Sequence, residues 1–399
     1  MSRTLRAATA AAFLMLSGAA FVASAQQSVR PEVGNPLKVA QGLTKAGKHR
    51  EALAEIAKAD AAGGKTAYEN LLINQMRGSV AAQAGDNETA MKAFDAVLAS
   101  GNLPAGEQQK YLQALSGIAY RAKDYPKAIT YATKYRTVGG TDPAIRTVLL
   151  QSYFLTNDCG NVSKMVGDVE SRKPTEEELQ ILANCHLKQK DSGGYVNAME
   201  KLATYYPKKE YWTDLLNRVQ KKPGFSDRLA LDVYRLKAAT GNITSAADYM
   251  EMAQLSLQAG IPAEAKNVVD KGYAAKVLGV GAEADRQKRL RDLVEKSLAD
   301  AKKARPALEA EAQAAKEGTD LVKIGANYVY EGSADKGIKM MEEGVKRGGL
   351  KRPDDAKLQL GEALIQAGQR GKAVNVLKDV KGTDGTADLA RLWSLLAQR

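Results

Sequence analysis

The chain has 399 residues, of which 44% are hydrophobic, 26% charged and only 6% aromatic. This balance is typical of a folded globular protein, and it excludes both a disordered chain and a multi-span membrane protein. Lysine and arginine number 58 against 46 acidic residues, so the formal net charge is +12. A positive excess favours anionic partners but says nothing about the fold.

The first 25 residues have the pattern of a secretory signal peptide. Arg3 and Arg6 precede an apolar stretch at 7–22, and the small residues Ala-Ser-Ala end at Ala25. The alternative is a membrane anchor, for which this stretch is short, and no second stretch of spanning length follows. A lipoprotein would need a cysteine where Gln26 stands. We expect cleavage after Ala25, export to a bacterial periplasm and no stable membrane insertion.

From residue 39 onward the chain repeats one spacing of mostly small residues. In the first copy, Ala40, Ala52 and Ala59 are separated by twelve and then seven positions. The same offsets recur at Gly78, Ala90 and Val97; Ser116, Ala128 and Tyr135; Leu150, Val162 and Val169; Ala183, Tyr195 and Leu202; Ala253, Ala265 and Gly272; Gly325, Gly337 and Gly344; and Gly361, Ala373 and Val380. Such spacing predicts antiparallel helix pairs, because small residues let two helices approach closely.

Turn-forming residues fall between the two helices of each predicted pair. They are Gly47, Gly85-Asp86, Lys123-Asp124, Asn157-Asp158, Lys190-Asp191, Gly260, Gly332 and Gly368. Glycine and asparagine readily adopt the left-handed conformation that ends a helix. Each pair would leave an apolar face uncovered, and stacking the next pair on it buries that face.

These residues resemble the tetratricopeptide repeat family, whose pattern combines small residues, a Gly-Asp turn and a terminal proline such as Pro174 or Pro207. The resemblance covers residues 26–399 as about ten hairpins, with weak repeats at 210–241 and 282–317. It implies an all-α, right-handed α-solenoid of stacked helix-turn-helix hairpins. It also implies a partner-binding scaffold that is not an enzyme.

Cys159 and Cys185 are the only cysteines, and an even pair in an exported chain suggests a disulfide. In the repeat frame, Cys159 begins the second helix of one hairpin, and Cys185 lies about one turn before the end of the next helix. Adjacent antiparallel helices bring those ends to the same side of the stack. The alternative is a pair of buried free thiols. A metal site is not expected, because His186 points away from Cys185 and no four-ligand set exists.

Catalytic signals are weak. The two histidines, His49 and His186, have no catalytic motif around them, and the acidic run at 176–178 follows Thr175 at a helix start, where acidic side chains favour the helix dipole. Periplasmic lytic transglycosylases carry a helical superhelix but add a lysozyme-like domain, whereas the repeats here continue to Leu396. We expect no enzyme, no cofactor and no metal.

Basic residues are spread over many hairpins, at Lys208-Lys209, Lys221-Lys222, Arg286 to Arg291, Lys302-Lys303 and Lys346 to Arg352. Solvated helix faces explain most of them, and export argues against nucleic acid. Binding of an anionic cell-wall or exported polysaccharide stays open as the alternative function.

The first helices of stacked hairpins line the concave face, where a solenoid normally binds its partner. We expect the partner-binding residues to be Gln113, Tyr120, Gln151, Phe154, Gln180, Asn184 and Leu187. Amides would bind the backbone of an extended peptide or a helix, and apolar side chains would anchor it. Packing between repeats is the alternative role for Tyr120 and Phe154. Exported proteins of this architecture serve Ton-type transport or envelope assembly, so the resemblance suggests a periplasmic adaptor for a cell-envelope protein complex.

Overall fold

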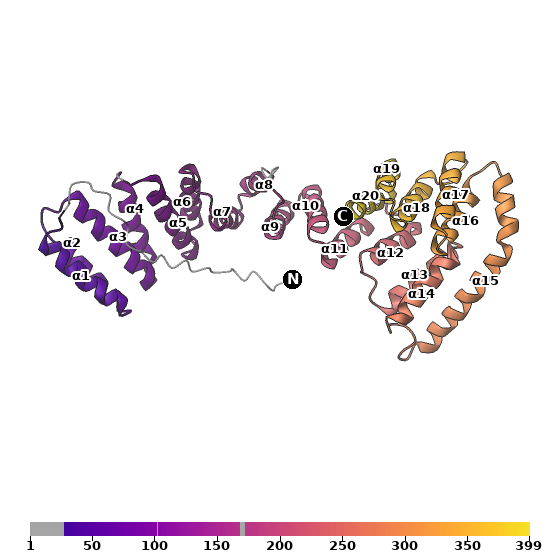
Figure 1. The fold of residues 1–399 in the computed structure, drawn as a ribbon, viewed down its shortest axis with the longest axis horizontal. Coiled ribbons are helices and arrows are strands. Elements are labelled where there is room, and N and C mark those ends of the chain that lie inside the picture. The colour runs from indigo at the N-terminus through magenta and orange to yellow at the C-terminus, as the bar shows by residue number, and fades with distance from the viewer. Residues whose placement is uncertain (1–27, 102, 168–171) are drawn as a thin grey trace. The chain divides into compact units, whose positions relative to one another are not determined.

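The computed structural model describes residues 28–101, 103–167 and 172–399 (Figure 1). This part of the chain contains 20 α-helices and one 3-10 turn, and no strand. It divides into two compact units, with the boundary between Thr156 and Asn157. The expected signal peptide lies outside the described residues. None of the helices within them is long and apolar enough to span a membrane.

Unit 1, which ends at Thr156, is built of three stacked helical hairpins and one further helix. Its helices are α1 (Pro31–Lys45), α2 (His49–Asp60), α3 (Ala67–Ala84), α4 (Asn87–Ala99), α5 (Ala105–Arg121), α6 (Tyr125–Thr137) and α7 (Pro143–Leu155). The pairs α1/α2, α3/α4 and α5/α6 are hairpins, and α7 packs on α5 and α6. The all-α solenoid expected from the sequence is therefore confirmed here.

The repeated small residues lie at the helix contacts, as the spacing predicts. Ala40, Ala52 and Ala59 are completely buried between α1 and α2. In the next hairpin, a Cβ atom added at Gly78 would lie 2.5 Å from the ring of Phe94. Only a residue without a side chain allows α3 and α4 to approach this closely.

The turns within the hairpins combine a left-handed residue with an aspartate cap. Lys123, for example, has a φ of 60°, and the next residue, Asp124, accepts a hydrogen bond from the backbone nitrogen of Lys127 at 3.1 Å. The left-handed residue ends one helix, and the carboxylate satisfies a backbone donor at the start of the next. Gly85-Asp86 and Lys190-Asp191 repeat this arrangement.

Unit 2 holds the remaining helices. They are α8 (Cys159–Gly167), α9 (Glu176–Lys188), α10 (Ser192–Tyr205), α11 (Lys209–Gln220), the 3-10 turn η1 (Asp227–Leu229), α12 (Ala230–Ala239), α13 (Ala246–Gln258), α14 (Pro262–Ala274), α15 (Ala284–Ala314), α16 (Thr319–Tyr330), α17 (Ala334–Arg347), α18 (Pro353–Gln366), α19 (Arg370–Lys378) and α20 (Thr386–Ala397). The pairs α9/α10, α13/α14, α16/α17 and α18/α19 form the hairpins that the small-residue spacing predicts. Val169, the last position of the Leu150 copy, lies outside the described residues.

The two weak repeats differ from the others. Residues 210–241 form α11, η1 and α12, which pack through large residues such as Trp212 and Leu215 where other hairpins have small ones. The segment 282–317 contains one 31-residue helix, α15, where the repeat frame expects two. The helix contains no glycine and is rich in alanine, leucine and long charged residues that favour a helix, and it continues through Pro306.

Unit 2 closes on itself, because its last helices return to its early ones (Figure 1). Helix α20 packs against α10 and α12. Ion pairs reinforce this closure: Lys222 with Asp388 at 2.6 Å, Arg228 with Asp355 at 2.7 Å and with Asp384 at 2.8 Å, and Arg391 with Glu200 at 2.5 Å. We use "the closure" below for this contact of α18–α20 with α10–α12.

Candidate functional site

The seven residues expected to bind a partner fall into both units. Gln113 and Tyr120 lie on α5, and Gln151 and Phe154 on α7, all within unit 1. The other three, Gln180, Asn184 and Leu187, lie on α9 of unit 2.

In unit 1, the amide of Gln113 is used inside the protein. Its Nε2 atom donates to Oδ2 of Asp142 at 2.6 Å, while Oδ1 of Asp142 caps α7 by accepting from the backbone of Ala144 at 2.8 Å. One turn earlier, Gln109 donates to the carbonyl of Val138 at 2.7 Å. These amides hold α5 against the connection between α6 and α7, a role that the sequence did not reveal.

The aromatic residues of unit 1 are half-buried. The ring of Tyr120 lies 5.8 Å from the ring of Tyr125, in a tilted arrangement that favours aromatic pairs. Phe154 and Gln151 are half-buried on α7. Each of these side chains has both a packed side and an accessible side, so an anchoring role for them stays a prediction.

In unit 2, Gln180, Asn184 and Leu187 form an exposed stripe along α9. They stand at positions i, i+4 and i+7, which share one side of a helix. Leu187 is 53% exposed. Thr213 and Asn217 are exposed on α11, the first helix of the following pair. We name these five residues the α9–α11 face.

Hydrogen bonds fix the two helices of this face relative to one another. Nε2 of Gln180 donates to the hydroxyl of Tyr211 at 2.7 Å, and that hydroxyl donates to Glu176. Glu176 also pairs with Lys208 at 2.6 Å. Partial burial raises the pKa of the Glu176 carboxyl, but the hydrogen bonds from Lys208 and Tyr211 outweigh it, and the pKa lies below its ordinary value. The carboxylate is thus charged and holds α11 against the start of α9.

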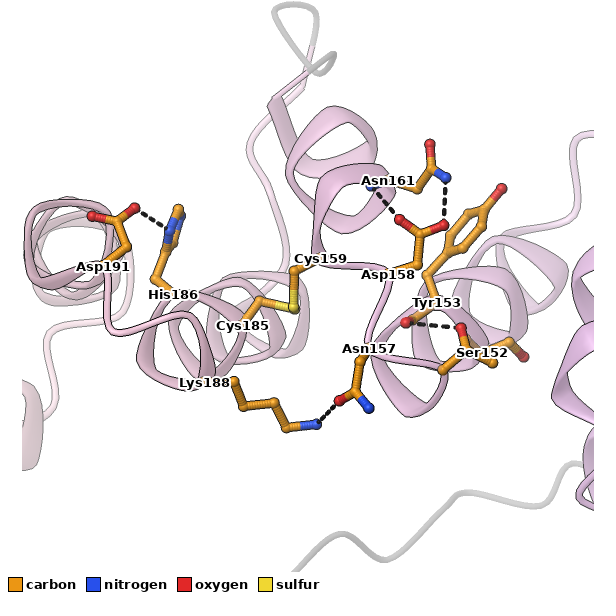
Figure 2. Close-up of a disulfide and its surroundings, with 11 residues drawn as sticks. Ser152, Tyr153, Asn157, Asp158, Cys159, Asn161, Cys185, His186, Lys188 and Asp191 are labelled. Carbon is orange, nitrogen blue, oxygen red and sulfur yellow. Dashed lines mark hydrogen bonds and ion pairs between the residues drawn. A yellow bond between two sulfur atoms is a disulfide. The ribbon is translucent and has the colours of Figure 1, made fainter.

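A disulfide joins Cys159 of α8 to Cys185 of α9 (Figure 2). The Cα atoms are 5.4 Å apart, and both cysteines are buried. This confirms the pairing and the geometry that the repeat frame predicts. Nearby, Nζ of Lys188 donates to Oδ1 of Asn157 at 3.0 Å. The covalent link and this hydrogen bond both hold the end of α9, where Leu187 lies.

The surroundings of His186 are structural. Nδ1 of His186 lies 2.8 Å from Oδ2 of Asp191, whose other oxygen accepts from the backbone of Gly194 and caps α10 (Figure 2). Within the described ranges, no three His, Cys, Asp or Glu side chains come together in a way that could hold a metal ion.

The basic clusters named from the sequence are interleaved with acidic partners. Arg286, Lys288 and Arg291 each pair with a carboxylate three or four residues away on or beside α15. Lys222 takes part in the closure, and Arg347 pairs with Glu343 at 2.5 Å. Exposed ion pairs of this kind are weak, but they reduce the positive potential that an anionic polymer would meet.

Sequence reasoning missed a buried ionic cluster inside unit 2. Arg235 of α12 donates to both oxygens of Glu264 of α14, each at 2.7 Å, and to Asp232 at 2.9 Å. It also reaches Oε2 of Glu362 on α18 at 3.3 Å. The signal available in the sequence was four charged residues at positions that the helix period places inside. Arg235 is 29 residues from Glu264 and 127 residues from Glu362, so no local pattern pairs them.

No family model matches the chain, and no curated protein matches it. Among solved structures, it is similar to one titled Naa15/Naa10 bound to HypK-THB, with 14% identity, a TM-score of 0.33 and coverage of 88% of this chain and 58% of that one. It is also similar to yeast Tom70, with 10% identity, a TM-score of 0.25 and coverage of 92% and 95%. A third is the P58(IPK) TPR domain, with 12% identity, a TM-score of 0.23 and coverage of 92% and 98%. The chain thus spans 58% of the chain in the first of these. The hairpins described above, with their buried small residues, give the chain a tetratricopeptide-type α-solenoid fold.

Proposed function

We propose that the protein is a non-catalytic scaffold that binds a protein or peptide of a cell-envelope complex through the first helices of its hairpins. The observation that carries this proposal is the α9–α11 face, where an exposed leucine lies in line with two exposed amides. Amides can donate to and accept from the backbone of a bound chain, and Leu187 offers an apolar anchor. A neutral face of this composition suits an extended peptide better than a charged polymer.

The rigidity of the face supports the same proposal. The disulfide, the Gln180–Tyr211–Glu176 hydrogen bonds and the capping box of Thr175 with Glu178 all fix α9 before any partner arrives. A preorganised surface loses less conformational entropy on binding, so a larger share of each contact appears as affinity.

The unit 1 residues Gln113, Tyr120, Gln151 and Phe154 are proposed to bind a partner within their own unit. Because Nε2 of Gln113 donates to Asp142, the proposal assigns the anchoring there to Tyr120 and Phe154. Their half-buried rings can add contact area at a small cost in entropy, since their packed sides are already ordered.

The proposed compartment is the periplasm, with the signal peptide cleaved after Ala25. A buried disulfide supports this location, because such bonds persist in oxidising compartments. A role as an accessory of Ton-type transport or of envelope assembly follows from the resemblance of the sequence.

The second candidate function is binding of an anionic cell-wall or exported polysaccharide. The net charge of +12 favours it, while the pairing of Arg286, Lys288 and Arg291 with neighbouring carboxylates weakens it. Binding of a polysaccharide through exposed basic residues should weaken at high salt, because salt screens contacts between exposed charges. Binding of a peptide through amides and Leu187 should persist.

A photo-crosslinking amino acid placed at position 187 in cells tests the proposal and identifies the partner by mass spectrometry. Leu308 provides a matched control, because it is a leucine on α15 with a similar exposure of 47%. We expect a protein adduct at position 187 that is absent at 308.

The identified partner then allows a quantitative comparison. Leu187→Ala should weaken its binding at least tenfold, while Leu308→Ala should leave the dissociation constant unchanged. Equal adducts at both positions would contradict the proposed scaffold. Retention of the protein on anionic polysaccharide that is lost at high salt would favour the glycan.

A further inference from the structure

The ionic cluster of unit 2 joins helices that are distant in the sequence. Arg235 and Asp232 come from α12, Glu264 from α14 and Glu362 from α18, and the side chains of all four are less than a tenth exposed. The ring of Tyr330 on α16 lies 6.0 Å from the guanidinium. The cluster therefore lies inside the closure, and its ionic state bears directly on whether α18 stays against α12.

The charges of this cluster do not balance. One guanidinium faces three carboxylates, so full ionisation would leave a net charge of −2 away from water. Burial of uncompensated charge is costly enough that a protein group neutralises itself instead. At least one of the carboxyl groups must therefore hold a proton in the folded protein.

Hydrogen-bond geometry distinguishes the three carboxyl groups. Glu264 receives two parallel hydrogen bonds from Arg235 at 2.7 Å, which is the arrangement a carboxylate needs. Asp232 receives one at 2.9 Å. Glu362 receives only a long one, at 3.3 Å to Oε2, and its Oε1 atom is buried without a hydrogen-bond partner. Of the three carboxyl groups, Glu362 would therefore receive the least stabilisation from hydrogen bonds if it were ionised.

A small cavity beside Glu362 completes the site. Its volume is about 10 Å³, and Arg235, Tyr330, Gln359 and Glu362 are among the residues that line it. This volume is close to the minimum that one water molecule requires. A protonated Oε1 could donate to such a water, and the indole nitrogen of Trp393, which is likewise buried without a partner, faces the same carboxyl group.

We propose that Glu362 is a buried proton-binding site, and that its bound proton is required for the closure of unit 2. Loss of the proton at alkaline pH places a second uncompensated negative charge beside Asp232 and Glu264. The repulsion acts between α18 on one side and α12 and α14 on the other, so the α18–α20 segment is the part that separates. The closure is thus a pH-dependent contact built into the fold.

The groups that face Glu362 from each neighbouring helix agree with this assignment. Arg235 and Asp232 face it from α12, Glu264 from α14, Tyr330 from α16, and the indole of Trp393 from α20. Burial raises the pKa of Glu362 well above its ordinary value. Attraction to Arg235 lowers this pKa in part, and repulsion by Asp232 and Glu264 raises it further. Burial also raises the pKa of Asp232, and attraction to Arg235 partly offsets that rise.

Two isosteric variants of the full chain test the proposal. Glu362→Gln keeps the shape and removes the ionisation, so we expect it to fold, to be at least as stable as the wild type at pH 7, and to lose the alkaline decline in stability. In the wild type this decline should begin above 4.5, the ordinary pKa of glutamate, and end at the raised pKa of folded Glu362, and between them it should approach a tenfold fall in the folded-to-unfolded ratio per pH unit for one proton. Glu264→Gln is the contrasting variant, which should be destabilised at every pH because Arg235 loses its bidentate partner.

Infrared spectroscopy reads the proton directly. The folded wild type at pH 7 should show the C=O band of a buried protonated carboxyl group, and Glu362→Gln should lack it. Hydrogen exchange should show that α18–α20 opens faster as the pH rises in the wild type and in the exposed control Glu283→Gln, beyond the intrinsic pH dependence of exchange that Glu362→Gln shows. No such band, or an alkaline decline that persists in Glu362→Gln, would overturn the proposal. Stability that depends on sodium or potassium at constant ionic strength would also overturn it, in favour of a bound cation.

Discussion

Gly325 of α16 and Gly337 of α17 face each other backbone to backbone. A Cβ atom added at Gly325 would lie 2.6 Å from the carbonyl oxygen of Gly337, and one added at Gly337 would lie 2.4 Å from that of Gly325. The same relation holds between Gly318 and Gly344 at the other end of the hairpin. Glycine at these positions lets the two helices approach more closely than any other residue would allow.

The first prediction follows from this contact. Gly325→Ala should destabilise unit 2 by about 1–3 kcal/mol, because the new methyl group meets backbone atoms, which cannot rotate away. Gly371→Ala on α19 is the matched control, since a Cβ atom there meets nothing within 4 Å, and it should change stability by no more than about 0.5 kcal/mol. Urea unfolding of both variants measures the difference. Equal stability of the two would show that the helices separate easily.

The second prediction concerns the disulfide. The bond between Cys159 and Cys185 closes a loop with a sequence separation of 26 residues. Replacing both cysteines with serine should lower the free energy of unfolding by about 3–4 kcal/mol on the chain-entropy account. Helix content should remain nearly unchanged, because stability in a solenoid is a sum over neighbouring contacts. Thiol titration of the denatured wild type should find no free thiol before reduction and two after it; free thiols in the oxidised protein would contradict the bond.

The third prediction concerns acid stability of unit 1. Glu69 accepts hydrogen bonds from the Arg30 side chain at 3.0 Å and 2.9 Å and from the backbone of Thr66 at 2.8 Å, and these bonds lower its pKa to about 2. A carboxyl group with a lowered pKa stabilises the fold above its ordinary pKa and loses that effect as the pH falls towards the folded value. The contribution should therefore disappear between about pH 4.5 and pH 2.

Glu69→Gln should remove this part of the acid transition. Its helices α1 and α3 should exchange amide protons faster at pH 6, while below pH 2 they should match the wild type. Glu51→Gln is the control, because Glu51 is exposed on α2. An unchanged acid profile in Glu69→Gln would show that the Arg30 pair contributes nothing to folding.

The fourth prediction separates binding from packing at Tyr120 and Phe154. If both rings are anchors, changing both to alanine should weaken partner binding by about 2 kcal/mol or more, since binding energy concentrates in aromatic residues. If they serve packing alone, the melting temperature should fall without a specific loss of affinity. Because the ring of Tyr120 contacts that of Tyr125, some stability should be lost in either case. Affinity and melting temperature must therefore be measured on the same folded variant. Unchanged affinity would assign the binding surface to α9 and α11.

The local pattern of the sequence was sufficient to predict the hairpins. Small residues at offsets of twelve and seven, and a left-handed residue before an aspartate cap, involve atoms within about one helix pair, so each signal is complete within a short stretch. The disulfide was predictable for the same reason, since Cys159 and Cys185 lie on adjacent elements. The candidate residues Gln180, Asn184 and Leu187 were placed on one side of α9 by the helix period alone, although their binding role stays a prediction.

What surrounds those side chains was decided by the tertiary structure. The sequence marks Gln113 and Gln180 as polar positions, but the partners that they bond, Asp142 and Tyr211, depend on how one hairpin stacks on the next. The closure and the Arg235 cluster lie further still from sequence reasoning, because Arg235 and Glu362 are 127 residues apart. Small rotations between successive hairpins add up along the stack, and only their sum brings α18–α20 back to α10–α12 and buries three carboxyl groups around one arginine.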